Sequence, residues 1–94
     1  MKRKEVEVVV RKVIDAIDKL SDIEIGDCIY NNSSSITPYG KIMCIGYDSV
    51  VIKWFLTEKQ IKDEVDEFEI IYDTHLGGWL FTLVDQKEVM AWLI

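Results

Sequence analysis

The sequence is poor in the residues that mark most catalytic and metal centres. Its 94 residues include one histidine and two cysteines, and no Ser/His/Asp or Cys/His arrangement accompanies His75. Cys28, Cys44 and His75 are one short of the four ligands of a structural zinc site, and their spacing matches no zinc motif. The five glycines form neither a phosphate loop nor a dinucleotide fingerprint. We therefore predict no catalytic residue, no metal site and no cofactor, and expect that the protein is not an enzyme.

Long apolar runs are also missing. No run approaches the roughly 18 residues that a membrane span requires. Behind the basic start Lys2-Arg3-Lys4, charged residues interrupt any signal-peptide core. We therefore expect a cytoplasmic protein without a membrane partner, in which Cys28 and Cys44 are thiols. The apolar fraction of 49% and the three tryptophans are enough for the core of one domain over residues 1–94.

The clearest structural signal is a hairpin over residues 40–55. Two runs of β-branched and aromatic residues flank a small polar turn at residues 47–49. A two-residue loop would give the hairpin one apolar face without charge, which is the predicted core face. A β-bulge near Met43 or Cys44 would also turn Ile42 inward, because one extra residue reverses the alternation. The predicted core face comprises Met43, Ile45, Tyr47, Val50, Ile52 and Trp54.

Residues 4–20 carry apolar side chains at helical spacing, with charged residues on the opposite side. This pattern predicts an amphipathic helix that packs on the sheet, because the sheet is the one apolar surface available to it. A strand over Glu5 to Val10 is the alternative interpretation, since those residues alternate in part. The predicted apolar stripe comprises Val6, Val9, Val10, Val13, Ile14, Ile17 and Leu20.

Three further segments complete the prediction. Residues 23–29 form a strand broken at Gly26-Asp27, and residues 31–39 form a loop rich in asparagine and serine. Residues 57–66 are polar and form either a turn of helix or a loop. Residues 86–94 form either a short helix or a last strand, and Asp85 and Glu88 have the spacing of a capping box.

A second hairpin is predicted on either side of Gly77-Gly78, which is a two-residue turn signal. In this hairpin Glu67 to Leu76 pairs with Trp79 to Val84. The alternation separates an apolar inner face from an outer face that carries His75 and several carboxylates. The predicted inner face comprises Phe68, Ile70, Tyr72, Leu76, Trp79, Phe81 and Leu83.

The segment from Ile25-Gly26-Asp27 through Gly40-Lys41-Ile42 to Lys53-Trp54 resembles the SH3-like barrel pattern. That group often begins with a Gly-Asp bend and continues with a hairpin of the form G-x-I followed by I-G-x-D and V-x-W. The resemblance covers residues 23–56 and implies an architecture, because the group includes peptide binders, RNA binders and inert structural barrels. The predicted fold class is α+β, with an N-terminal helix (4–20) packed on a five-stranded antiparallel SH3-like barrel (23–94).

Charge is distributed unevenly along the chain. Residues 1–20 carry six basic and four acidic side chains, whereas residues 21–94 carry five basic and thirteen acidic ones. Segments that join hairpins often hold binding residues, and dense like charge is relieved by a basic partner. We therefore predict a partner-binding site in the acidic segment, defined as residues 58–69, together with two outward aromatic residues. The predicted site residues are Glu58, Asp63, Glu64, Asp66, Glu67, Phe55 and Tyr39.

The predicted function is a non-enzymatic protein-interaction module, a small regulatory or inhibitory accessory protein of the kind made by phages and mobile elements. Its partner is another protein, and a basic one would match the acidic segment. The alternative is a nucleic-acid-binding barrel that uses the basic N-terminal helix through Lys2, Arg3, Lys4, Arg11 and Lys12, although the acidic net charge of −6 disfavours nucleic acid. Chain ends seldom carry an apolar run such as the one at the C-terminus, so either the barrel or a second copy should cover it, and a homodimer is the favoured prediction. The predicted dimer contact is formed by Trp92, Leu93 and Ile94.

Overall fold

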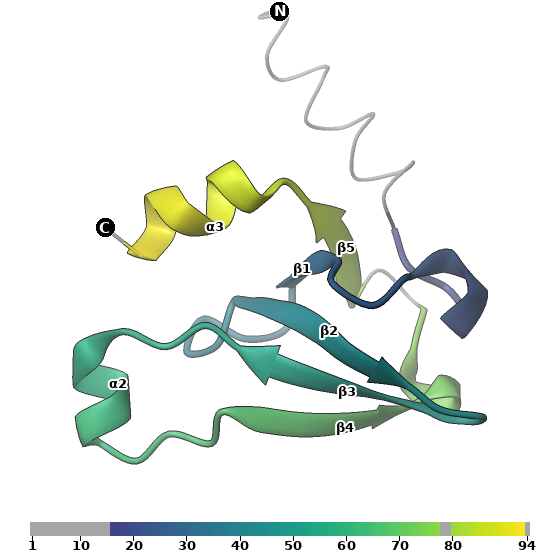
Figure 1. Cartoon of the computed structure of the whole chain (residues 1–94), viewed down its shortest axis with the longest axis horizontal. Helices are drawn as coiled ribbons and strands as arrows, with labels where there is room; N and C mark the ends of the chain where they lie inside the picture. The colour runs from purple at the N-terminus through teal and green to yellow at the C-terminus, as the bar shows by residue number, and fades with distance from the viewer. Residues whose placement is uncertain (1–15, 78–79, 94) are drawn as a thin grey trace, which may run out of the picture.

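A computed structural model describes residues 16–77 and 80–93 of the chain (Figure 1). Its core element is one antiparallel sheet, and short helices lie in the connections and at the C-terminal end. The elements in chain order are η1 (Leu20–Asp22), β1 (Cys28–Asn31), β2 (Tyr39–Ile45), β3 (Ser49–Trp54), α2 (Glu58–Lys62), β4 (Phe68–Tyr72), η2 (Asp73–His75), β5 (Phe81–Val84) and α3 (Gln86–Leu93).

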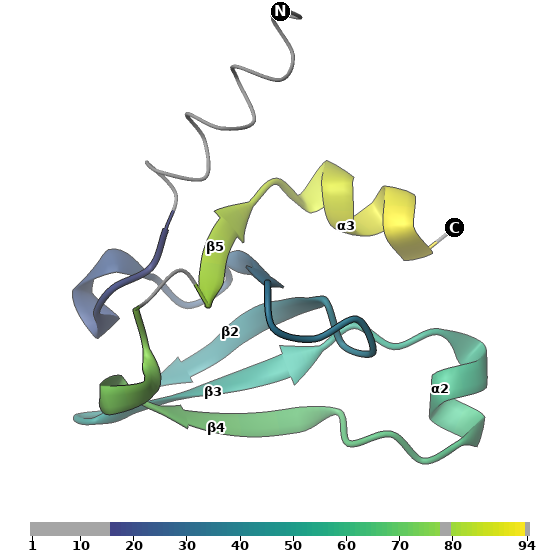
Figure 2. The ribbon, with the colours of Figure 1, turned by 180° about the vertical axis from the view of Figure 1, so that it is seen from behind.

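The sheet has five strands in the order β4-β3-β2-β1-β5, and every neighbouring pair is antiparallel. The first four strands form a meander, after which the chain returns so that β5 pairs with β1 (Figure 2). The predicted five antiparallel strands are therefore present. Because β4 and β5 occupy opposite ends of the order, the sheet is open.

The predicted N-terminal helix is wrong as part of this fold. Most of residues 4–20, including the alternative strand over Glu5 to Val10, lies outside the described residues. The described end of the segment is extended: Ala16 forms a β-bridge with Thr82, and the Ile17 N–H donates to the Phe81 carbonyl at 3.0 Å. A short 3-10 turn follows, because the Asp22 carboxylate accepts the backbone N–H of Lys19 and its neighbour.

The helix that packs on the sheet is instead α3, at the C-terminal end of the described chain. The Lys87 backbone N–H donates to the Asp85 carboxylate at 3.0 Å, which is an N-cap interaction. Val89 is fully buried, and the Trp92 ring lies 5.7 Å from that of Tyr39. Tyr39 also donates its hydroxyl to Glu88 at 2.9 Å. These contacts decide the open question in favour of a helix over Gln86–Leu93.

The predicted central hairpin is confirmed, and its register contains the bulge. The Gly46 N–H donates to the Ser49 carbonyl, and the pairing shifts between Ile42 and Cys44. Ile42 is consequently buried and Met43 exposed. Of the predicted core face, Met43 and Tyr47 are therefore placed wrongly, the first by the bulge and the second by its position in the loop.

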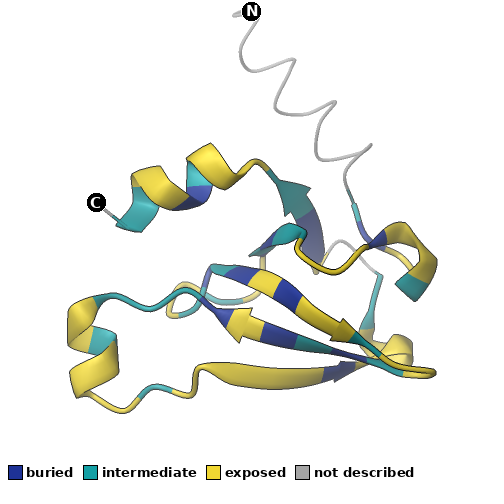
Figure 3. Cartoon of the chain, in the orientation of Figure 1, coloured by how far each residue is buried: buried dark blue, intermediate teal, exposed yellow. Residues whose placement is uncertain are grey.

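The second predicted hairpin is wrong in its pairing, and its predicted inner face is wrong for β4 but right for β5, where Phe81 is buried and Leu83 packs against the core. Strand β4 pairs with β3 and β5 with β1, so the chain beyond Gly77 does not turn straight back. Gly77 itself adopts φ 92°, which glycine tolerates, after the η2 turn. In β4, Ile71 is buried opposite Val50, whereas the residues predicted to face inward are exposed (Figure 3).

The main core lies on one face of the sheet. Gly40 stands opposite Trp54, and a Cβ on Gly40 would come within 2.7 Å of the Trp54 ring and of the Ile52 side chain. The absent side chain therefore lets these two large residues pack over the strand. The buried core residues are Ile17, Ile23, Ile29, Ile42, Val50, Ile52, Trp54, Ile71 and Phe81.

Candidate partner-binding site

The acidic segment begins with α2, which local signals at both ends define. At its start Thr57 accepts the Gln60 N–H at 3.3 Å, and the Gln60 side chain accepts the Thr57 N–H at 3.0 Å. This reciprocal pair is a capping box. The Gln60 amide also donates to the Ile36 carbonyl, which ties the helix to the loop between β1 and β2.

At its end α2 closes with a Schellman motif. The Val65 N–H donates to the Gln60 carbonyl at 3.1 Å, and the Glu64 N–H donates to the Ile61 carbonyl at 3.1 Å. The motif places Glu64 at φ 59°, in the left-handed region where glycine is usual. Glu64 therefore holds a position at which a side chain costs stability, and its carboxylate makes no contact within the described chain that repays the cost.

We expect the substitution Glu64→Gly to raise the free energy of unfolding by about 1 kcal/mol, because glycine removes the steric cost of the left-handed conformation. Urea denaturation followed by tryptophan fluorescence measures the change. Glu58→Gly, in the first turn of α2, is the matched control that removes the same charge from a helical position, and it should destabilise. A Glu64→Gly variant no more stable than the parent would contradict the strain at this position.

The carboxylates of the acidic segment are exposed, and few of them are neutralised. Glu67 pairs with Lys53 at 3.4 Å between Oε1 and Nζ, in a half-exposed geometry. Glu69 accepts the Trp54 indole N–H at 3.2 Å. Within residues 16–77 and 80–93, the carboxylates of the other predicted acidic residues have neither an ion pair nor a hydrogen bond. Those residues are Glu58, Asp63, Glu64 and Asp66.

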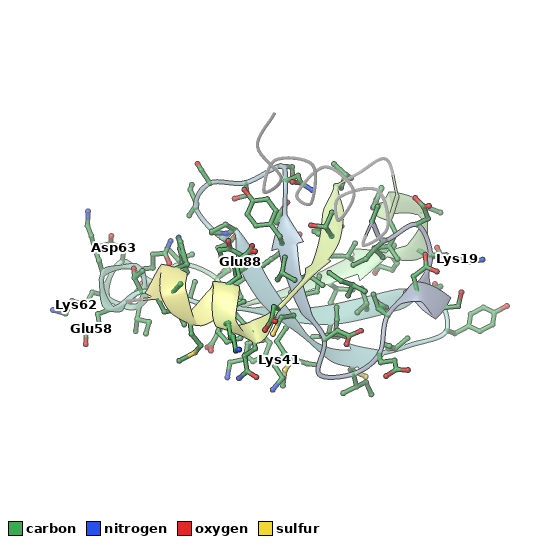
Figure 4. The ribbon with its side chains drawn as sticks, turned by 90° about the horizontal axis from the view of Figure 1, so that it is seen from above. Lys19, Lys41, Glu58, Lys62, Asp63 and Glu88 are labelled. Carbon is green, nitrogen blue, oxygen red and sulfur yellow. The ribbon has the colours of Figure 1, made fainter. Side chains whose placement is uncertain are left out.

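These side chains gather at one end of the molecule. Figure 4 shows Glu58, Lys62 and Asp63 projecting from α2 into solvent, whereas Lys19 projects from the opposite end. From Asp63 to Glu69 the chain carries five carboxylates and no lysine or arginine. The five are Asp63, Glu64, Asp66, Glu67 and Glu69. The resulting field attracts cations and weakens as salt is added.

The two aromatic residues of the predicted site are joined by a backbone hydrogen bond, but the Tyr39 ring packs away from the acidic segment. Phe55 is half-buried directly before α2, and its backbone N–H donates to the Tyr39 carbonyl at 2.9 Å. The Tyr39 ring instead lies between Tyr30, at 5.2 Å between centroids, and Trp92 of α3. Tyr39 thus belongs to the contact between the sheet and α3, and Phe55 is the one that adjoins the acidic segment along the chain.

The sequence did not predict that three apolar side chains of β4 lie on the surface. Phe68, Ile70 and Tyr72 are 56%, 57% and 50% exposed. Alternate residues of a strand point to opposite faces. The face with three apolar residues was predicted to be the core face, because the opposite face has Ile71 as its single apolar residue. The one contrary signal was the consecutive pair Ile70-Ile71, which offers an apolar residue to either face.

The remaining candidate groups do not form a centre. Cys44 is exposed and Cys28 half-buried, and neither is in a disulfide. Burial raises the pKa of the Cys28 thiol, against a smaller opposing effect of Lys41. His75 is exposed in η2. The described residues contain no group of three or more histidine, cysteine or carboxylate side chains that could hold a metal ion.

The predicted dimer residues lie at the end of α3. Trp92 and Leu93 are half-buried, and Ile94 lies outside the described residues. The homodimer stays a prediction. Within the described chain no helix has both the length and the apolar character needed to cross a bilayer.

Comparison with known proteins gives no relative on which to base a function. No family model matches the chain, and neither a curated protein nor a solved structure matches it.

Proposed function

We propose that this protein is a non-enzymatic protein-interaction module whose acidic segment recruits a basic protein partner. The observation that carries the proposal is the group of exposed carboxylates in and just after α2 that have no ion pair or hydrogen bond within the described residues, namely Glu58, Asp63, Glu64 and Asp66. An unpaired cluster of one sign destabilises the free protein, and a basic partner offsets that repulsion. The left-handed Glu64 supports the same conclusion, because it keeps a charge where glycine would stabilise the fold.

We also propose that the sheet belongs to the SH3-like group. The meander of β1 to β4 followed by the return of β5 to β1 supports this assignment, as does the bulged hairpin at Ile42. In such an architecture function resides in the attached surfaces rather than in the sheet itself. A role as a regulatory or inhibitory accessory protein is compatible with a module that only binds.

Nucleic-acid binding is not carried forward as a second function. The residues that would contact phosphates are Lys2, Arg3, Lys4, Arg11 and Lys12, which all lie outside the described residues. The described sheet presents carboxylates instead, and a phosphate backbone requires a basic patch.

Affinity capture from the native host tests the proposed function. The immobilised protein should retain a basic protein in a low-salt wash and release it as the ionic strength rises, because salt screens exposed charges. A control column carries the variant Asp63→Asn, Glu64→Gln, Asp66→Asn, Glu67→Gln and should retain much less of it. Equal retention of the captured protein on the two columns would contradict a role for the acidic segment.

A further inference from the structure

Strand β4 is an open edge of the sheet in the described part of the chain. It pairs with β3 on one side and stands at the end of the strand order. It runs along the lower margin of the molecule in Figure 1, and no other described element lies along its outer side there or in Figure 2. An open edge is a template for pairing with a further strand.

The ladder between β3 and β4 identifies the free backbone groups. The Trp54 N–H donates to the Glu67 carbonyl at 2.6 Å, and the Asp73 N–H donates to the Asp48 carbonyl at 2.8 Å. Hydrogen-bonded residues alternate along an antiparallel strand, so the odd-numbered residues of this strand bond to β3. The N–H and C=O groups of Phe68, Ile70 and Tyr72 therefore point to the open side.

These same three residues present exposed apolar side chains on the outer face of the sheet. An antiparallel strand added to β4 would place a hydrogen-bonded residue directly opposite each of them, with its side chain on that face. The alternate residues of the added strand would fall on the other face. There they would stand beside Glu67, Glu69 and Asp73.

We propose that β4 binds an extended segment of the partner as a further antiparallel strand, in which apolar and basic residues alternate. The apolar residues cover Phe68, Ile70 and Tyr72, and the basic residues lie beside the carboxylates on the other face. This inference rests on the proposed function and specifies the shape and sequence pattern of the basic partner. On the face that carries Phe68, Lys53 of β3 already lies with its Nζ 3.4 Å from Glu67 and 5.9 Å from the Phe68 ring centroid.

Charge also decides against a second copy of this chain as the occupant. Two β4 strands paired antiparallel about Ile70 would set Glu67 of each copy opposite Asp73 of the other. Like charges directly opposite each other on paired strands are destabilising. Edge strands are often protected by charged residues, and the charged residues from Glu67 to Asp73 are all acidic. They therefore repel a second copy and attract a basic strand.

The test uses a capped, fluorescent nonapeptide of alternating lysine and valine, with binding measured by fluorescence anisotropy at low salt. One derivative is N-methylated at its valines and a second at its lysines, so that all three peptides keep the same charge. In the productive register the valine N–H groups face β4 and the lysine N–H groups face solvent. We expect valine methylation to weaken binding at least about tenfold, and lysine methylation to change it less than about threefold.

Each outcome bears on a different part of the proposal. Equal binding of all three peptides would overturn strand addition and leave the acidic segment as the binding surface. Binding of none of them would overturn the proposed function as well. Light scattering of the protein alone over a dilution series provides a second readout. A dimer whose Phe68, Ile70 and Tyr72 amides become protected from exchange as its concentration rises would show that a second copy occupies the edge, which contradicts the inference.

Discussion

Replacing Ile17 with alanine is expected to lower the free energy of unfolding by about 2–5 kcal/mol, the cost of removing a large aliphatic side chain from a core. Ile17 is 1% exposed and belongs to the main core, although it precedes the first strand of the sheet. Its backbone is fixed to β5 through the Phe81 carbonyl, so the cavity cannot readily close. Domains are typically stable by about 5–15 kcal/mol, so the loss is a large share.

Ile25→Ala is the matched control for this prediction, because it makes the same chemical change eight residues further on. Ile25 is 67% exposed, and its truncation should change stability by no more than about 0.5 kcal/mol. Urea denaturation followed by tryptophan fluorescence compares the two variants with the parent. Similar losses for Ile17→Ala and Ile25→Ala would show that the segment before β1 is not packed as described.

The central hairpin could be predicted from the sequence because its determinants are local. Gly46 to Ser49 closes a short loop, and both flanking runs are rich in β-branched residues. The bulge at Met43 was foreseeable for the same reason, since it lets Ile42 join the apolar face. Both ends of α2 are also local, with a capping box at Thr57.

The pairing of β4 and β5 could not be predicted, because it depends on contacts distant in sequence. Gly77-Gly78 is a strong turn signal, yet β5 pairs with β1, fifty or more residues earlier in the chain. The register between β4 and β3 decides which residues of β4 point into the core, and it sets Ile71 opposite buried Val50. Phe68, Ile70 and Tyr72, which were predicted to lie in the core, are therefore on the surface.

The candidate site was predictable in its charge and unpredictable in its shape. The sequence alone shows where the carboxylates of residues 58–69 lie along the chain. The left-handed Glu64 and the open edge of β4 depend on backbone conformation and strand order, which charge counting does not include. Tyr39 illustrates the reverse case, because α3 covers a ring that the sequence suggested was free to bind a partner.

Neutralising the acidic segment is expected to slow association with the captured basic partner by at least about tenfold at low salt, since electrostatic steering contributes roughly 10- to 1,000-fold to association rates. The variant Asp63→Asn, Glu64→Gln, Asp66→Asn, Glu67→Gln removes four negative charges while changing side-chain size very little. Its dissociation rate should change less, because charges at the rim of an interface act mainly on encounter. Its fold should be retained, because three of the four carboxylates have no partner within the described chain.

A second pair of variants tests whether the position of the removed carboxylates matters, and not only the total charge of the protein. The double variant Asp63→Asn, Asp66→Asn and the double variant Asp18→Asn, Glu24→Gln remove the same charge from two different parts of the chain. Asp18 and Glu24 are exposed, and Asp18 adjoins Lys19 at the end opposite α2 (Figure 4). Only the first pair should slow association measurably.

The most direct test of the proposed role of the acidic segment is stopped-flow measurement of the association rate at two salt concentrations. For the parent, the rate should fall steeply as ionic strength rises towards physiological values, where charges are screened over about 8 Å. For the neutralised variant, the rate should already be low and should depend little on salt. Equal association rates for parent and variant at both salt concentrations would contradict the account, because the carboxylates from Asp63 to Glu67 would then take no part in finding the partner.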